Sequence, residues 1–189
     1  MPTDSVTPSP QQLKALTHPA RLRMLGMLRV DGAATATSLA RALGLNTGAT
    51  SYHLRQLATH GFIEEDTERG NGRDRWWRAT SASTRTANPP PDDVEANDTN
   101  EAYLQAVTTI YAEQLQRSVE ELPLLPRAWR EVVTYSDWRL RISPAGAARL
   151  LERLQEVIES TEDEVGDDAA SYVVNVNGFV RPGQLGGDR

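Results

Sequence analysis

The stretch Leu39-Ala-Arg-Ala-Leu-Gly-Leu-Asn46, followed directly by Thr47-Gly-Ala-Thr-Ser-Tyr-His-Leu-Arg-Gln-Leu57, decides the fold of this chain. Apolar residues recur at helical spacing in both halves of the stretch. Gly44 stands between them, where a left-handed residue commonly ends a helix, and Asn46 is a typical cap for the next helix. The pattern predicts two helices joined by a tight turn. We expect Thr37 or Ser38 to cap the first, and the second to end near His60.

The sequence on either side of this pair predicts more helix and then a hairpin. Upstream, Pro19 suits the first turn of a helix that presents Leu22, Leu25 and Leu28 on one face, with Arg21, Arg23 and Arg29 outside. Downstream, Phe62-Ile63 starts a strand, Gly70-Asn71-Gly72 is typical of a hairpin turn, and residues 75–79 form the returning strand. The whole segment therefore predicts a winged helix-turn-helix domain, in which the second helix enters the major groove of DNA and the hairpin reaches phosphates.

The candidate DNA contacts lie on the outward part of the second helix and on the hairpin. They are Thr47, Thr50, Ser51, Tyr52, His53, Arg55, Arg69, Arg73 and Arg75. Two of these assignments stay open, because Thr50 also suits the inner face of the helix and His53 suits a structural or phosphate-facing role better than metal binding. Arg55 suits a guanine edge or a phosphate equally well. Trp76 and Trp77 alternate across a strand, so one of them should face the core.

Three motifs resemble the ArsR-type winged-helix repressors. They are Leu16-Thr-His-Pro-Ala-Arg-Leu-Arg-Met-Leu25, Leu39-Ala-Arg-Ala-Leu-Gly-Leu45, and Ser51-Tyr-His-Leu-Arg-Gln-Leu57 with Gly61-Phe-Ile63. The resemblance covers about residues 12–80 and implies a dimeric repressor of transcription that binds double-stranded DNA. Many members of that family are released from DNA by metal ions, and many others sense no metal.

The chain departs from that family in two respects. The best-known metal site of the family uses cysteines on the helix before the recognition helix, whereas this chain has no cysteine at all and no histidine or carboxylate over residues 34–40. We therefore expect no metal site and no cofactor. The chain also continues for more than 100 residues past the wing, which suggests a separate domain for assembly or sensing.

The charge divides along the chain. The net charge of −6 combines +3 over residues 1–80, with ten Lys/Arg and seven Asp/Glu, and −9 over residues 81–189, with ten and nineteen. The basic part carries the helix-turn-helix, as DNA binding requires. We predict an α+β chain with five segments, each defined by its composition: a disordered tail at 1–10, the winged domain at 11–80, a proline-rich flexible linker at 81–100, a second domain at 101–180 and a disordered tail at 181–189.

The second domain should contain a dimerisation helix over 101–122 and then a strand-helix-strand unit. The helix carries an apolar stripe that includes Tyr103, Tyr111 and Val119, and an internal core helix is the alternative reading. The expected strands lie at 131–142 and 172–180, on either side of a helix that Ser143-Pro144 begins. Six carboxylates among residues 159–168 predict a solvated loop rather than a calcium site.

Three aromatic residues of this part, Trp129, Tyr135 and Trp138, suit either a pocket for a small apolar ligand or an ordinary core. No nucleophile elbow, phosphate loop or Ser/His/Asp arrangement is present, so we expect a protein that is not an enzyme. No secretory signal or apolar run of membrane length is present, so we expect no membrane association and a cytoplasmic location. A winged-helix protein-interaction module and a repressor released by a small apolar ligand are the alternative functions.

Overall fold

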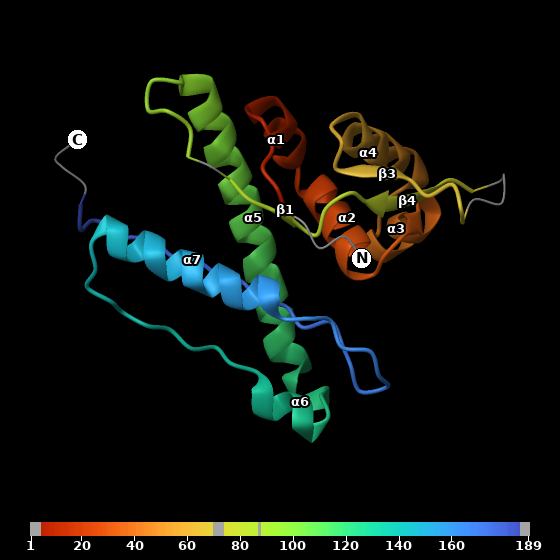
Figure 1. Ribbon diagram of the computed structural model, residues 1–189. Helices are drawn as coiled ribbons and strands as arrows, with labels where there is room; N and C mark the ends of the chain where they lie inside the picture. Colours follow the sequence, from red (N-terminus) through yellow and green to blue (C-terminus); the bar gives the residue numbers. More distant parts are fainter. Residues whose placement is uncertain (1–4, 70–73, 87, 186–189) are drawn as a thin grey trace. The chain divides into compact units, whose positions relative to one another are not determined.

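The computed structural model describes residues 5–69, 74–86 and 88–185 (Figure 1). The chain divides into two compact units, residues 1–121 and 122–189. We call them the first unit and the second unit. The first unit contains the predicted helix-turn-helix, and mixed helices and short strands confirm the α+β class.

In four helices of the first unit, the side chain of the residue before the helix accepts a hydrogen bond from a free backbone N–H of the first turn. They are α1 (Pro10–Leu16), α2 (Pro19–Val30), α3 (Ala36–Leu43) and α4 (Thr47–Thr59). Asn46 caps α4 by accepting a hydrogen bond from the Ala49 amide at 2.8 Å, and Gly44 ends α3 with a φ of 65°, both as predicted. The cap of α3 is Thr35 rather than Thr37 or Ser38, because Thr35 and Ser38 form a reciprocal capping box.

A three-stranded antiparallel sheet lies beside these helices, in the order β2 (Ala34–Thr35), β4 (Trp76–Ala79), β3 (Ile63–Glu65). β3 and β4 are the arms of the predicted wing, while its turn, Gly70-Asn71-Gly72, lies outside the described residues. Trp77 is buried and Trp76 is half-buried, so the pair divides across the strand as expected. The sheet fixes the wing next to the start of α3, because β2 leads directly into that helix.

The core of the first unit is built from all of its long helices and from the strand after α4. Its fully buried side chains are Leu16, Met24, Leu25, Leu39, Thr50, Leu54, Leu57, Phe62 and Ile63. The helix α5 (Val94–Glu121) packs on α1 and α2 and adds Tyr103 to this core. Burial raises the pKa of Tyr103 to about 12. The first half of α5 therefore belongs to the same hydrophobic core as the helix-turn-helix.

The expected linker over 81–100 contains more regular structure than its prolines suggested. The helix α5 begins at Val94 rather than 101, because the Asp93 carboxylate accepts a hydrogen bond from the Ala96 amide at 3.0 Å. The short strand β5 (Ser83–Thr84) pairs in parallel with β1 (Ser5–Val6), which lies in the expected tail.

The side chain of Arg29, expected outside, reaches the segment around β5. It donates hydrogen bonds to the Ser81 carbonyl at 2.9 Å, the Ser81 hydroxyl at 3.1 Å and the Thr84 hydroxyl at 3.0 Å. Arg23 forms an ion pair with Glu113 at 2.6 Å, although it too was expected outside, and this pair ties α2 to α5. The path from the wing to α5 is therefore fixed by side chains of α2.

The second unit contains the helices η1 (Leu122–Leu124), α6 (Arg127–Val132) and α7 (Pro144–Ser160). The helix α7 starts at Ser143-Pro144 as predicted. The two expected strands are wrong for the chain as described, because 131–132 lie in α6 and neither 133–142 nor 172–180 forms a strand. Both segments are extended but lack a ladder partner in the described parts, and alternation of apolar residues cannot supply one.

No helix in the described part of the chain has both the length and the apolar composition that crossing a bilayer requires.

Candidate nucleic-acid interface

The outward face of α4 carries polar side chains at the spacing of one helical turn. Thr47 and Arg55 are exposed, Ser51 between them is half-buried, and the three share one face because they are four residues apart. Tyr52, on the neighbouring line of the helix, is 51% exposed. Four of the predicted contacts therefore lie on an accessible surface of α4.

Thr50 does not belong to this surface. Its side chain is fully buried, and its hydroxyl donates to the Asn46 carbonyl at 3.0 Å. The prediction of Thr50 as a DNA contact is wrong, and its alternative on the inner face is confirmed. The physical reason is helical phase, since residues 50, 54 and 57 follow the spacing of the buried stripe.

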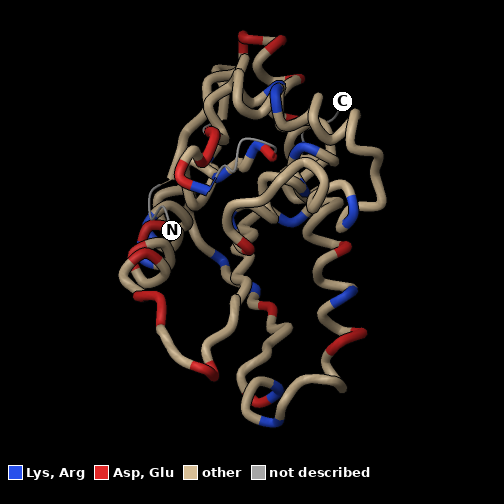
Figure 2. The backbone as a smooth tube through the Cα atoms, turned by 90° about the vertical axis from the view of Figure 1, so that its right-hand side faces the viewer, with Lys and Arg blue, Asp and Glu red and all other residues tan. Residues whose placement is uncertain are grey.

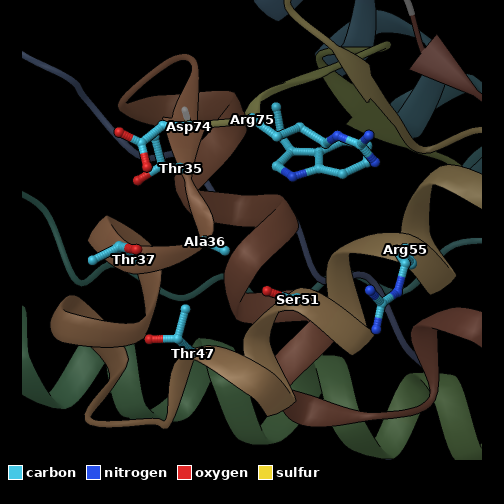
Figure 3. A pocket seen from close by; sticks show the side chains of 9 residues that line it. Thr35, Ala36, Thr37, Thr47, Ser51, Arg55, Asp74 and Arg75 are labelled. Carbon is cyan, nitrogen blue, oxygen red and sulfur yellow. The ribbon is translucent and has the colours of Figure 1, made fainter. Parts of the chain in front are cut away.

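A shallow hollow of about 240 Å³ opens between the start of α3, the outward face of α4 and the strand β4 (Figure 3). Its lining residues are Thr35, Ala36, Thr37, Thr47, Ser51, Arg55, Asp74, Arg75 and Trp77. Four hydroxyl groups and two guanidinium groups thus surround one concave surface. The hydroxyls of Thr35 and Thr37 were not predicted as site residues, although their place at the start of α3 was a signal for them.

His53 faces α2 rather than the hollow. Its ring lies 4.5 Å from the ring of His18 and 5.5 Å from that of Tyr52, measured between centroids. Burial lowers the pKa of His53, and the nearby charges of His18 and Arg21 lower it further. The neutral ring therefore packs α4 against the start of α2, which favours the structural alternative. No group of three potential metal ligands occurs within residues 5–69, 74–86 and 88–185.

The arginines of the wing are paired with carboxylates of the same hairpin. Arg75 lies 3.1 Å from Glu65, and Arg69 lies 3.7 Å from Asp66, measured between nitrogen and oxygen. Arg78, which was not predicted, forms the same kind of pair with Glu64 at 2.8 Å. Figure 2 marks the positions of lysine and arginine and of aspartate and glutamate along the backbone. Arg73 lies outside the described residues.

This pairing has an electrostatic consequence. Arg69, Arg75 and Arg78 each have more than half of the side chain exposed, so solvent screens these ion pairs, least of all where Arg69 meets the largely buried Asp66. A phosphate would therefore compete with the carboxylate for each guanidinium. By contrast, Arg55 makes no ion pair with any residue that the structure describes.

The three aromatic residues predicted for a ligand pocket do not share one enclosed surface. Trp129 stacks on Tyr172 with ring centroids 6.2 Å apart, and the Tyr172 hydroxyl donates to the Val132 carbonyl at 2.8 Å. Trp138 is 78% exposed and Tyr135 is 45% exposed. The partner of Trp129 was not predicted, because 43 residues separate the two rings in the sequence.

Comparison with known proteins bears on the helix-turn-helix alone. A family profile described as "Helix-turn-helix domain" matches residues 16–66. The HTH-type transcriptional regulator YgaV of Escherichia coli (strain K12) is 42% identical over 52 residues, which make up 28% of this chain and 52% of that protein. The chain thus spans about half the length of this curated relative.

Among solved structures, an apo mutant of ZitR from Lactococcus lactis is similar at 15% identity and a TM-score of 0.35, over 75% of this chain and 83% of that one. Residues 16–66 are a helix-turn-helix domain, and their relative is a transcriptional regulator.

Proposed function

We propose that the chain is a sequence-specific DNA-binding regulator of transcription, which works as a homodimer and represses its target genes. The observation that carries the proposal is the surface formed by Thr47, Ser51 and Arg55 on α4, next to the hollow shared with α3 and the wing. A second helix of a helix-turn-helix reads base edges mainly with residues at its N-terminal end, where Thr47 and Ser51 lie, and Arg55 follows one turn later on the same face.

The contacts divide into two kinds. Arg55 and Thr47 are proposed to read base edges, since an arginine pairs well with guanine and a threonine suits several bases. Arg69, Arg73 and Arg75 are proposed to bind phosphates, as are the hydroxyl groups around the hollow. To bind a phosphate, Arg69 must break its ion pair with Asp66, and Arg75 must break its pair with Glu65. These contacts should therefore add less affinity than contacts from unpaired arginines. The affinity should fall linearly with salt on a log–log plot.

The dimer is proposed to form along the second half of α5. Tyr103 is buried in the core of its own chain, and Val107 packs against that core. Tyr111, Leu115 and Val119, farther along the same predicted stripe, are 37%, 53% and 48% exposed. The stripe thus serves two roles, with its first half inside the first unit and its second half available to a two-fold partner.

The proposal is tested by gel shift with the promoter of the operon that encodes the protein. Arg55→Ala and Thr47→Ala should each weaken specific binding, the arginine change by about tenfold or more, because a bidentate base contact is worth about 1–3 kcal/mol. Arg153→Ala is the matched control, since it removes an arginine from the second unit, and it should leave the affinity unchanged.

Two outcomes would redirect the proposal. Unchanged binding of both α4 variants would show that α4 is not the recognition helix. The absence of any salt-dependent DNA binding by the purified dimer would favour a protein-interaction module instead. Because a regulator of DNA works in the compartment that holds the DNA, a cytoplasmic location remains part of the proposal. A small-molecule effector also remains a proposal, although the largely exposed Trp138 gives it no support.

A further inference from the structure

The described part of the second unit has no hydrophobic interior of its own. No described residue from 122 to 185 is buried, whereas the first unit buries a continuous core. Large apolar side chains are exposed throughout the second unit, among them Leu124 at 82%, Trp138 at 78% and Phe179 at 81%. Ordering a segment of this length costs conformational entropy that only buried apolar surface can offset. Another surface is therefore needed to cover these side chains.

Two extended segments of this unit have the sequence of half-buried strands without a partner. In the first, Trp138, Leu140 and Ile142 alternate with arginines, and in the second, Tyr172, Val174 and Val176 occupy alternate positions. Neither segment forms a backbone ladder with any part of the chain that the structure describes. Apart from Tyr135, the backbone of each segment has no ladder partner among the described residues, and apolar side chains occupy alternate positions at 138–142 and 172–176, as in an edge strand.

The two segments flank α7, which can cover one face of a sheet. The second segment runs back along α7 in Figure 1, and an added Cβ at Gly178 would lie 3.5 Å from a methyl group of Leu151. Leu151, Leu154 and Ile158 remain 44%, 39% and 43% exposed on the helix. The helix and both strand-like segments thus present apolar surface that this copy leaves open.

Charge in the second unit is complementary between segments. Arg139 and Arg141 lie on the polar side of the first extended segment and form no ion pair among the described residues. The loop after α7 carries Glu162, Asp163, Glu164, Asp167 and Asp168, again without an ion pair within the described ranges. A second copy brings the opposite charge to each of these groups, so two second units are complementary to each other.

We propose that the second unit is completed by the second unit of another copy of this chain. The segments 133–143 and 171–180 of the two copies form one sheet, and the α7 helices cover it. A two-fold axis matches such a surface with itself, because both copies carry the same two segments and the same charges. This inference rests on the homodimer of the proposed function but does not depend on DNA binding.

The test measures amide hydrogen exchange of the intact chain, peptide by peptide, over a dilution series in which analytical ultracentrifugation gives the fraction of dimer. Peptides from 133–143 and 171–180 should exchange at least about tenfold more slowly in the dimer than in the monomer. Peptides from α2 should exchange equally in both and serve as the internal reference. Fast exchange of the two segments in the dimer, or equal protection in the monomer, would overturn the inference.

A matched pair of double variants checks which face carries the contact. Val174→Ser with Val176→Ser removes the apolar face of the second segment and should abolish its slow exchange in the dimer. Asn175→Ser with Asn177→Ser changes the opposite face of the same segment and should preserve it. Equal effects of the two double variants would also contradict the proposed sheet.

Gel shift of the same samples separates this inference from the proposed function. DNA binding by a dimer whose two segments exchange rapidly would refute the shared sheet and leave the regulator intact. Slow exchange in a dimer that binds no DNA would refute the regulator and leave the shared sheet intact.

Discussion

The helices α4 and α7 begin alike but lie in different surroundings. Asn46 caps α4 through the Ala49 amide, and Ser143 caps α7 through the Gly146 amide. Both helices carry an apolar stripe, yet Leu54 of α4 is fully buried while Leu154 of α7 is 39% exposed. Local signals are thus sufficient to place a helix in either unit. Among the described residues, the first unit alone adds the buried hydrophobic core that turns helices into a stable domain.

Truncating Leu54 and Leu154 should give the largest difference between the units in the free energy of unfolding. Leu54→Ala should lower the free energy of unfolding by about 3 kcal/mol, because it leaves a cavity in a packed core. Leu154→Ala should lower it by less than about 1 kcal/mol at concentrations where the chain is monomeric, since most surface substitutions are nearly neutral. Urea denaturation followed by circular dichroism measures both values. A similar loss for both variants would mean that α7 has a core within its own chain.

A smaller difference in the free energy of unfolding is expected between variants of two arginines, one in each unit. Arg29→Met should cost about 2 kcal/mol, because it leaves the partners at Ser81 and Thr84 without their donor. Arg139→Met removes an exposed arginine of the second unit and, at concentrations where the chain is monomeric, should change the free energy of unfolding by no more than about 0.5 kcal/mol. Thermal unfolding of the two variants provides the comparison. A neutral result for Arg29→Met would show that the segment after the wing is held by other contacts.

Removing a helix cap should change the free energy of unfolding by about 1 kcal/mol, and the change should stay within the unit that holds the cap. Asn46→Ala should lower the free energy of unfolding of the first unit by about that amount, because the Ala49 amide loses its acceptor. Ser143→Ala should speed amide exchange at the start of α7 and leave the first unit unchanged. Hydrogen exchange of the two variants measures both effects. If Ser143→Ala destabilised the first unit as well, the two units would unfold as one.

The smallest effect is a pH dependence confined to the first unit, where all three histidines lie. The pKa of His53 lies below its ordinary value of 6.5 in the folded chain, mainly because of burial. The unfolded chain therefore takes up the proton first, and stability should fall as the pH drops through about 6.5 toward the lower folded value. Urea denaturation at pH 7.5 and pH 5.5 should show a weaker decrease for His53→Gln than for the parent chain. The opposite order would contradict the assigned direction.

Most of the helix-turn-helix was predictable because its signals are local. Gly44, Asn46 and the leucine spacing each lie within a few residues of the feature they determine. Thr50 was ambiguous because a polar residue on the buried stripe resembles one on the exposed face. The hydrogen bonds of Arg29 join residues 52 and 55 apart in sequence, and no local pattern indicates such a contact.

The second unit was much less predictable from its sequence. Alternating apolar residues predicted strands at 131–142 and 172–180, and neither forms in the described chain, because a strand also requires a neighbour that is not encoded in the same segment. The candidate DNA contacts fall between these cases. Helical phase places Thr47 and Arg55, while the carboxylate partners of Arg69 and Arg75 depend on the pairing of two strands.

The pairing of β1 with β5 has a consequence for how the chain folds. Ser5 and Ser83 are 78 residues apart, and bringing the ends of such a loop together costs about 4 kcal/mol of chain entropy. Two residue pairs cannot offset that cost alone, so this contact should form only after α1, α2 and α5 have packed, and it should be among the first to open. A bulky group fused near the N-terminus would hold the contact open. Since Thr84 belongs to β5 and accepts a hydrogen bond from Arg29, such a fusion would loosen the path from the wing to α5 at a distance from the recognition helix.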